Sequence, residues 1–393
     1  MKVILNCSTL NKGGSLQAAV SFIRTAVKRS DEIQWHFIVS KSVAYELQYS
    51  GSFTNCSLLT VMDESPAKSY KSRGLLRKIV EEHNPDVVFT FFGPSYVDFS
   101  KPHLCGVADG WVTHGDHWAW KTVEGPLAAC KLVAHIAYKA IMYRKADAWV
   151  TESLLAKEGL KKRLRLSEDR IFVVPNSCGT HYLNCQSDPK STSGKKTRIL
   201  CMAAFYRHKN LNLVPHVAKE LQIIMPNLNF EFVMTIPHSE QGFAAIASKA
   251  KELGVLDKII NVGRVSVGQG PELYRSCQIL FLPSVLETFS ANYPEAMAMG
   301  VPIVTTDLRF ARDVCGDAAL YFKPMNARDA ARAIGFLTQN EEFQRSLIEK
   351  GKRVLAGFPD QDTKYDMYKR CIRSLHEQCA EGKVEKSVGN LFF

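Results

Sequence analysis

The sequence lacks most of the features that mark disulfide-rich, zinc-binding or membrane-spanning proteins. Its 11 cysteines are scattered, and none of them forms a C-x-x-C pair. This pattern argues against a disulfide scaffold and a structural zinc site, and it is typical of a reducing cytoplasm. No apolar run approaches the roughly 18 residues of a spanning helix, and the N-terminus becomes polar too early for a signal peptide. We therefore expect a cytoplasmic protein that is neither secreted by that route nor embedded.

Acidic residues are also under-represented, because 39 of them face 50 basic residues and the net charge is +11. Such a balance favours anionic partners, which are a nucleotide, a phospholipid surface or nucleic acid. The sequence has no zinc finger, RNA-binding aromatic motif or long basic tail, so we expect no nucleic acid. A hydrophobic content of 46% and a length of 393 residues indicate a soluble globular protein with two domains.

The most informative stretch of the chain is residues 279–305. An apolar run is followed by a turn with Glu287, a helical pattern with Glu295, and a second apolar run after Gly300. Because neither run alternates with polar residues, the pattern predicts two buried parallel strands joined by a helix. Ser290 is expected to cap this helix and Gly300 to end it.

In such a unit, ligands lie beyond the carboxyl ends of the strands, where free backbone amides favour anions. Two carboxylates, Glu287 and Glu295, are costly there unless they bind hydroxyl groups. A sugar nucleotide supplies a diphosphate for the amides and hydroxyls for the acids. The alternative is two solvated carboxylates near the ends of a helix.

These residues resemble the donor-site signature of a known enzyme family. The signature consists of Pro283-Ser284, Glu287, seven residues, Glu295-Ala296 and Gly300-Val-Pro302-Ile-Val. It is similar to that of retaining glycosyltransferases of the GT-B fold, family four (group 1). The resemblance implies two Rossmann-like, doubly wound α/β domains facing across a cleft, with the C-terminal helix returning to the N-terminal domain. It also implies that Glu287 holds hydroxyls of the transferred sugar and Glu295 those of the ribose.

Strands alternate with helices along the whole chain, which is typical of doubly wound sheets. Residues 1–178 are predicted to form the acceptor-binding domain, 179–196 a linker, 197–358 the nucleotide-sugar domain, and 359–393 the returning helix. The predicted strands are 2–7, 34–38, 58–62, 86–91, 104–107, 147–151, 197–202, 229–234, 259–262, 279–282 and 303–305, and residues 171–177 close the first half. The predicted helices include 16–27, 127–143, 210–224, 242–253, 272–276, 329–337, 341–354 and 364–378.

Several further residues are expected to bind the donor. Arg207 and Lys209 follow the first strand of the second domain, where a diphosphate needs positive charge. Family members usually carry Gly-Arg before the Lys, whereas here the Gly is Ala and Arg207 lies closer to Lys209. Gly263 permits a close backbone approach to the base. The amides after Glu287 are expected to stabilise charge on the diphosphate, and they belong to Thr288, Phe289 and Ser290.

The N-terminal glycine loop is a weaker candidate. Gly13 and Gly14 lie between the first strand and helix, but the motif G-x-G-x-x-G is absent. An ordinary strand-to-helix turn is an equal alternative. In the resembled family, the corresponding glycines approach the donor diphosphate.

The acceptor side contains a loop rich in His, Asp and Trp. Many relatives have a His-Asp pair after the preceding strand, and here Ala108 replaces the His while Asp109 remains. We expect Asp109 near the acceptor hydroxyl, with His114 as the second candidate. Residues 114–117 read His-Gly-Asp-His, but no further ligand is spaced to complete a metal site, so we expect no metal and no cofactor. The D-x-D at 360–362 is interpreted as a helix cap.

Lys131, His135 and Lys139 recur every four residues within an otherwise apolar helix. One interpretation is a buried crossover helix with one solvent-exposed edge. The other is peripheral docking on an anionic leaflet, which a lipid-linked acceptor requires. The inner face of the cytoplasmic membrane would then be the site of action.

We therefore interpret the chain as a retaining glycosyltransferase that moves a sugar from a nucleotide-diphosphate sugar to a glycan or lipid-linked glycan, in surface polysaccharide or lipopolysaccharide synthesis. Two alternatives remain at this stage. One is a nucleotide-sugar epimerase or phosphorylase on the same scaffold. The other is a non-catalytic two-domain protein that binds a nucleotide or sugar.

Overall fold

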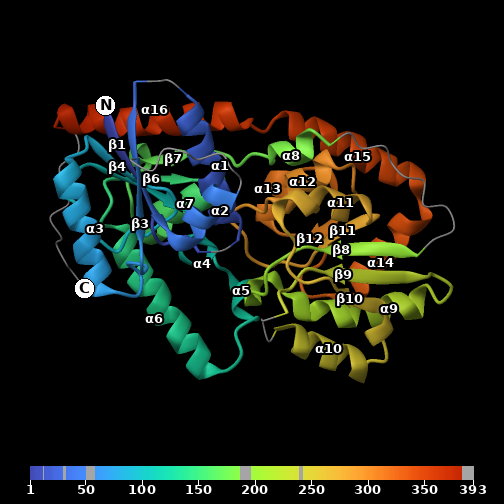
Figure 1. The fold of residues 1–393 in the computed structure, drawn as a ribbon. Helices are drawn as coiled ribbons and strands as arrows, with labels where there is room; N and C mark the ends of the chain where they lie inside the picture. Colours follow the sequence, from blue (N-terminus) through green and yellow to red (C-terminus); the bar gives the residue numbers. More distant parts are fainter. Residues whose placement is uncertain (12, 30–31, 50–57, 186–195, 239–241, 383–393) are drawn as a thin grey trace. The chain divides into compact units, whose positions relative to one another are not determined.

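The computed structural model describes residues 1–11, 13–29, 32–49, 58–185, 196–238 and 242–382 (Figure 1). The chain divides into two compact units. The first contains the described residues of Met1–His114, Cys130–Asn176 and Pro359–Phe393, and the second those of Gly115–Ala129 and Ser177–Phe358. Residues 115–129 thus group with the second unit, whereas the sequence placed them in the first domain. Most of the predicted linker, residues 186–195, lies outside the described residues.

The first unit contains a parallel sheet of seven strands in the order β3-β2-β1-β4-β5-β6-β7. Every residue of β4, β5 and β6 is buried, as is typical of parallel strands covered on both faces. The strand order reverses between β1 and β4, so the crevice that can take a ligand lies at their carboxyl ends. The strands are β1 Lys2–Cys7, β2 Gln34–Ser40, β3 Leu59–Met62, β4 Val87–Thr90, β5 His103–Val107, β6 Ala148–Thr151 and β7 Ile171–Val173.

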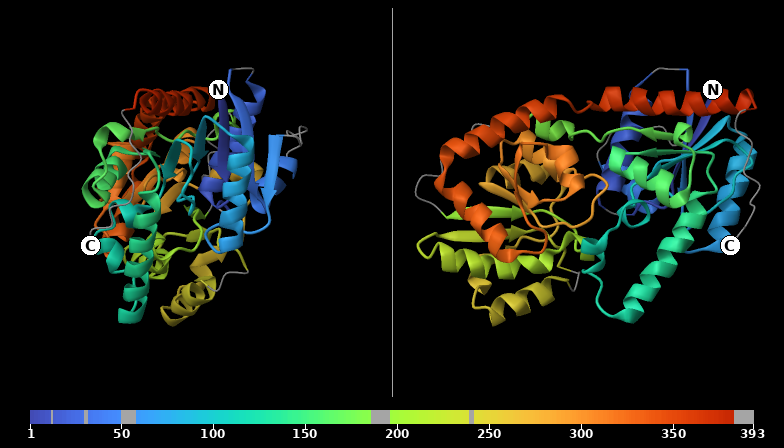
Figure 2. Two further views of the ribbon diagram at one scale, coloured as in Figure 1. Left: turned by 90° about the vertical axis from the view of Figure 1, so that its left-hand side faces the viewer. Right: turned by 180° about the vertical axis from the view of Figure 1, so that it is seen from behind.

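The last helix of the chain, α16 (Gln361–Ala380), packs in the first unit beside α1, Gly14–Lys28 (Figures 1 and 2). Tyr365 and Tyr368 are buried in the same hydrophobic core as the first strands, and Trp35 Nε1 donates to the Tyr365 hydroxyl at 3.0 Å. The predicted cap is confirmed, because the carboxylate of Asp360 accepts from the Thr363 amide at 2.7 Å. The other helices are α2 Lys41–Tyr49, α3 Tyr70–His83, α4 Gly110–Thr113, α6 Pro126–Tyr143, α7 Leu154–Leu164 and the 3-10 helix Glu168–Arg170.

The second unit contains a parallel sheet of six strands in the order β10-β9-β8-β11-β12-β13. Here the order reverses between β8 and β11. The strands are β8 Thr197–Cys201, β9 Phe230–Met234, β10 Ile259–Asn261, β11 Ile279–Leu282, β12 Ile303–Thr306 and β13 Ala319–Phe322. The helices are α5 His117–Trp120, α8 Thr180–Leu183, α9 Val214–Ile224, α10 Gly242–Glu252, α11 Gly270–Arg275, α12 Asn292–Ala298, α13 Arg309–Cys315, α14 Ala327–Gln339 and α15 Glu341–Ala356, and the 3-10 helices are Arg207–Lys209, Leu211–Leu213, Leu256–Lys258 and Val267–Gln269.

Two local expectations were wrong or incomplete. Ser290 does not cap α12, because the helix begins at Asn292 and the residue before it, Ala291, is already helical with φ −60° and ψ −24°. Ser290 is instead a buried residue. Two elements were not predicted: β13, which is an apolar run of only four residues, and α13, in which charged residues separate the apolar ones. The predicted fold class, two doubly wound parallel α/β sheets, is otherwise confirmed.

Candidate functional site

The reversal point of the second sheet brings together two residues that lie 78 positions apart. Lys209 follows β8 and Glu287 follows β11, and Lys209 Nζ lies 2.5 Å from Glu287 Oε1. The side chains are 17% and 9% exposed, so this ion pair is largely removed from water. The Val285 amide donates to the His208 carbonyl at 2.8 Å and joins the two loops beside the pair. The carboxyl ends of neighbouring parallel strands therefore hold a cation and an acid in contact.

The segment after Glu287 is packed tightly between this pair and α12. Thr288 and Ser290 are buried, and the Phe289 ring meets the Phe358 ring edge-on at 5.8 Å. The helix itself is tied to the sheet, because the Tyr293 hydroxyl lies 2.9 Å from Thr305 Oγ1. The backbone between Glu287 and α12 is thus held in a defined position.

Glu295 has a different environment from Glu287. The Tyr274 hydroxyl donates to Glu295 Oε2 at 3.2 Å, and the Tyr182 hydroxyl lies near enough to the same carboxyl group to lower its pKa. Burial raises the pKa of Glu295 to about 8, and the two tyrosine bonds lower it only in part. The site therefore combines one carboxylate that is neutralised by a lysine with one that is held by neutral hydroxyl donors.

The remaining donor-side candidates surround this arrangement in the same unit. Arg207 lies exposed in the 3-10 helix that also contains Lys209. Gly263 has φ +77°, and a Cβ at this position would lie 2.6 Å from the His238 ring. This glycine therefore cannot be replaced without moving the imidazole or straining the backbone.

The first unit contains the acceptor-side candidates. Asp109 caps α4 with one carboxylate oxygen, and its Oδ2 lies 2.7 Å from Lys139 Nζ on α6. Burial lowers the pKa of Lys139, but the Asp109 carboxylate more than offsets this and the net pKa is raised. His114 lies at the other end of α4, with Nδ1 2.8 Å from Thr113 Oγ1. Asp109 is thus an ion-paired carboxylate, and Lys139 is a partner that sequence reasoning missed.

The glycine loop follows β1, at the reversal point of the first sheet. Gly13 has φ +78° and directly precedes α1, which begins at Gly14. A Cβ at either position would meet no atom within 4 Å, so the positive φ of Gly13, rather than crowding, accounts for that glycine.

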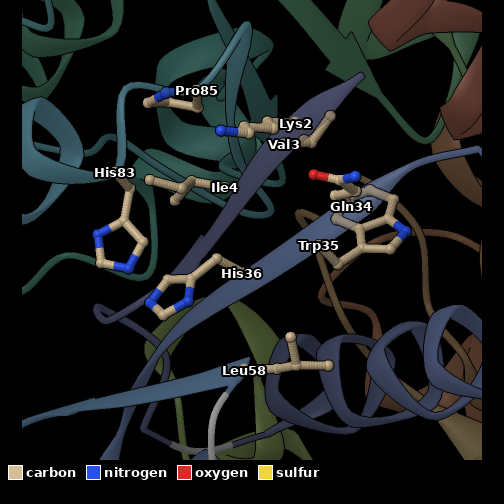
Figure 3. A pocket seen from close by; sticks show the side chains of 9 residues that line it. All are labelled: Lys2, Val3, Ile4, Gln34, Trp35, His36, Leu58, His83 and Pro85. Atoms are coloured by element: carbon tan, nitrogen blue, oxygen red, sulfur yellow. The ribbon is translucent and has the colours of Figure 1, made fainter.

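A hollow of about 260 Å³ lies elsewhere in the first unit (Figure 3). Lys2 and Gln34, the first residues of β1 and β2, line it together with His36 and His83, whose rings lie 4.0 Å apart. These residues are at the amino ends of the strands or close to them. The hollow is therefore at the opposite edge of the sheet from the predicted ligand-binding loops.

The fold and the side chains at the edge of the second sheet define an α/β domain suited to an anionic ligand that carries hydroxyl groups. Residues 186–354 match the family model described as Glycosyl transferases group 1. This segment contains the sheet of the second unit, Lys209, Glu287 and Glu295. The second unit thus carries a glycosyl transferases group 1 domain.

Similar proteins agree with this match. The chain is 23% identical over 190 residues to the O-antigen chain mannosyltransferase RfbU of Salmonella typhimurium, and the match covers 48% of this chain and 50% of that relative. It thus spans about half the length of the curated relative. Among solved structures, a glycosyltransferase from Rickettsia africae has a TM-score of 0.69 at 16% identity, covering 95% of this chain and 98% of the other. Anabaena Alr3699/HepE, solved in complex with UDP and glucose, has a TM-score of 0.67 at 12% identity, with 98% and 99% covered.

Proposed function

We propose that this chain is a retaining glycosyltransferase that moves a hexosyl or deoxyhexosyl group from a nucleotide-diphosphate sugar to a hydroxyl of a glycan or lipid-linked glycan. The observation that carries the proposal is the buried contact between Lys209 and Glu287 at the reversal point of the second sheet. The names of two similar proteins, the O-antigen chain mannosyltransferase RfbU and the lipopolysaccharide outer core galactosyltransferase WaaB, support a role in the synthesis of O-antigen, lipopolysaccharide or another surface polysaccharide.

The Lys209–Glu287 pair suits a substrate that is both an anion and a polyol. Lys209 supplies positive charge to the diphosphate, and exposed Arg207 adds a second cation from the same short helix. Glu287 accepts hydrogen bonds from hydroxyls of the transferred sugar, and its own charge stays balanced by Lys209. The amides of Thr288, Phe289 and Ser290 then face charge that grows on the leaving diphosphate.

Transfer with retained configuration proceeds by attack on the same face of the sugar from which the diphosphate departs. The bond from the anomeric carbon to the diphosphate breaks, the bond to the acceptor oxygen forms, and the acceptor proton passes to the leaving diphosphate. No metal is required in this scheme, because Arg207, Lys209 and the amides supply the countercharge. Asp109 and His114 are proposed to orient the acceptor. The glycines Gly13 and Gly14 are proposed to approach the donor diphosphate, and Gly263 the base.

A two-step experiment tests this function. Thermal-shift measurements with uridine, guanosine and thymidine diphosphates are expected to show stabilisation by one of them, because a ligand that binds only the folded state raises its stability. Mass analysis of products with the matching sugar donors then identifies transfer. Release of the diphosphate without a glycosylated acceptor would indicate an epimerase or phosphorylase, and binding without turnover would indicate a non-catalytic binding protein.

The exposed helix α6 supports the further proposal that the chain docks on an anionic membrane surface. No helix among the described residues is long and apolar enough to cross a bilayer. Of the residues of α6, all of which are described, only Tyr143 is buried, so the alternative of a buried crossover helix is wrong. Leu127, Val133 and Ile141 are 68%, 54% and 48% exposed.

The charge of this helix favours a lipid surface over a second copy of the chain. No acidic residue occurs between positions 125 and 146, whereas Lys131 and Lys145 are exposed. Two such helices facing each other would place like charges together, while anionic headgroups complement them. A chain docked on the membrane through α6 would lie at the surface where a lipid-linked acceptor is located.

Replacing two exposed apolar residues of α6 tests the docking proposal. Val133→Asp with Ile141→Asp is expected to weaken binding to vesicles that contain phosphatidylglycerol by about tenfold or more, since each change removes buried area and adds a repelled charge. Co-flotation of protein and vesicles measures the binding. Ile223→Asp, a 60% exposed residue of α9, is the matched control and should bind like the wild type. Equal flotation of all three proteins would contradict the proposal.

A further inference from the structure

Two tyrosine hydroxyls from different elements face the carboxyl group of Glu295, and that of Tyr274 donates to Oε2 at 3.2 Å. Tyr274 comes from α11, whereas Tyr182 comes from α8, which packs on both α11 and α12 (Figure 1). Tyr274 is fully buried and Tyr182 is 4% exposed, and their rings meet edge-on at 5.6 Å. Neither phenol can therefore turn freely toward water.

Gly270, the first residue of α11, leaves room for the Tyr182 hydroxyl. A Cβ at Gly270 would lie 2.2 Å from the Tyr182 hydroxyl oxygen, closer than any real contact between such atoms. Gly270 has an ordinary φ, so its backbone does not require glycine. The lack of a side chain at this position is thus explained by the place that the Tyr182 hydroxyl occupies.

We propose that Tyr182 is a positioning residue of the nucleotide-ribose subsite, which orients the Glu295 carboxylate for the two vicinal hydroxyls of the sugar. This inference rests on the function proposed above. An ionised carboxylate has about four lone-pair positions. The tyrosine hydroxyls take up part of this accepting capacity and restrain the orientation of the group, and the remaining positions can accept from a ribose diol.

The same geometry predicts how binding depends on pH. The groups that face Glu295 are the hydroxyls of Tyr274 and Tyr182 and the thiol of Cys178. Burial raises the pKa of both tyrosines, and it raises the pKa of Cys178 to about 12. The His181 ring lies 4.3 Å from the Tyr182 ring at a tilt of 43°, and burial lowers the pKa of His181 below its ordinary value. Glu295 is therefore the group of this cluster that ionises as pH rises through about 8.

Loss of the Tyr182 hydroxyl is expected to act through Glu295. The hydrogen bonds from the tyrosines stabilise the ionised form, so Tyr182→Phe should raise the pKa of Glu295 further. Gly270→Ala should do the same, because it displaces the hydroxyl without removing it. Carbon-13 NMR of labelled glutamate carboxyls in the ligand-free protein measures this pKa, and the resonance is assigned by its absence in Glu295→Gln.

Nucleotide titrations provide the second readout. Calorimetry with UDP and GDP is expected to show that Tyr182→Phe binds the preferred diphosphate about tenfold more weakly at about pH 8. The corresponding 2′,3′-dideoxy diphosphate should bind both proteins equally, because it lacks the hydroxyls that Glu295 accepts. Tyr321→Phe, whose hydroxyl donates to the Gly316 carbonyl at 2.7 Å, is the matched control.

The outcomes separate the two proposals. An unchanged Glu295 pKa in both variants, or equal loss of affinity for the natural and the dideoxy nucleotides, would overturn the role of Tyr182. Failure of the wild type to bind any nucleoside diphosphate would overturn the proposed function and with it the subsite.

Discussion

Glu287→Gln is expected to reduce sugar transfer by about a hundred- to a thousandfold, the loss typical of removing one electrostatic group from a preorganised site. The amide keeps the size of the side chain, but it cannot hold the charge of Lys209 or accept sugar hydroxyls as a carboxylate does. Nucleoside diphosphate binding should change much less, because Lys209, Arg207 and Glu295 remain. Transfer is measured as glycosylated product formed per unit time, and near-normal rates would remove the proposed role of Glu287.

The change also leaves Lys209 without its carboxylate, so a loss of activity has to be separated from a loss of folding. Breaking a buried ion pair costs about 3 kcal/mol or more of unfolding free energy. The second unit offers a matched control in Glu231, a buried carboxylate on β9 that lies 2.6 Å from Lys196 and 2.9 Å from Arg198. Glu231→Gln should lower the melting temperature in the same way and leave transfer near the wild-type rate.

Glu295→Gln is expected to abolish most of the stabilisation by nucleotide while leaving the ligand-free protein folded. The pKa of Glu295 in the empty site is about 8, so the carboxyl is mostly protonated at neutral pH and the neutral amide replaces it at little cost. Binding requires the ionised group to accept the ribose hydroxyls, and the amide has fewer acceptor positions. Dissociation constants from calorimetry should rise by about a hundredfold. An unchanged thermal shift with the nucleotide would count against the ribose assignment.

The same variant separates the protonation of Glu295 from other effects of pH on stability. The folded-state pKa of Glu295 lies above its ordinary value of 4.5, so its contribution to stability is fully present below that ordinary value and is lost as pH rises through about 8. The melting temperature of the wild type should therefore fall between about pH 4.5 and about pH 8 more steeply than that of Glu295→Gln. Parallel curves for the two proteins would show that this carboxyl does not titrate in that range.

The structure of residues 279–305 could be predicted from the sequence because the signals in this stretch are local. A continuous apolar run predicts a strand buried on both faces, and a glycine after a short helical pattern predicts where that helix ends. These signals placed β11, α12 and β12 within a few residues of their observed bounds. The alternation of strands and helices predicted both sheets for the same reason, although β13 was missed because it is short.

Contacts between segments that are distant in the sequence could not be predicted from such local signals. Nothing near Asp109 in the chain indicates Lys139 as its partner, and nothing near Glu295 indicates Tyr182, because these pairs depend on how separate helices pack. The exposure of α6 could not be predicted for the same reason. Its sequence suits a buried helix as well as a surface helix, and only the packing around it shows that most of its residues remain in contact with water.

The sequence by itself determined that this chain forms two parallel α/β sheets and that two glutamates, a lysine and several glycines follow their strands. Periodicity, composition and turn residues act over a few neighbouring positions, so these signals can be recognised in the sequence itself. Only the tertiary structure decided that Lys209 neutralises Glu287 and that two phenols hold Glu295. The physical reason is that desolvation and ion pairing depend on distances of a few ångströms between groups far apart in the chain, and the reversal of strand order brings those groups to one edge of the sheet.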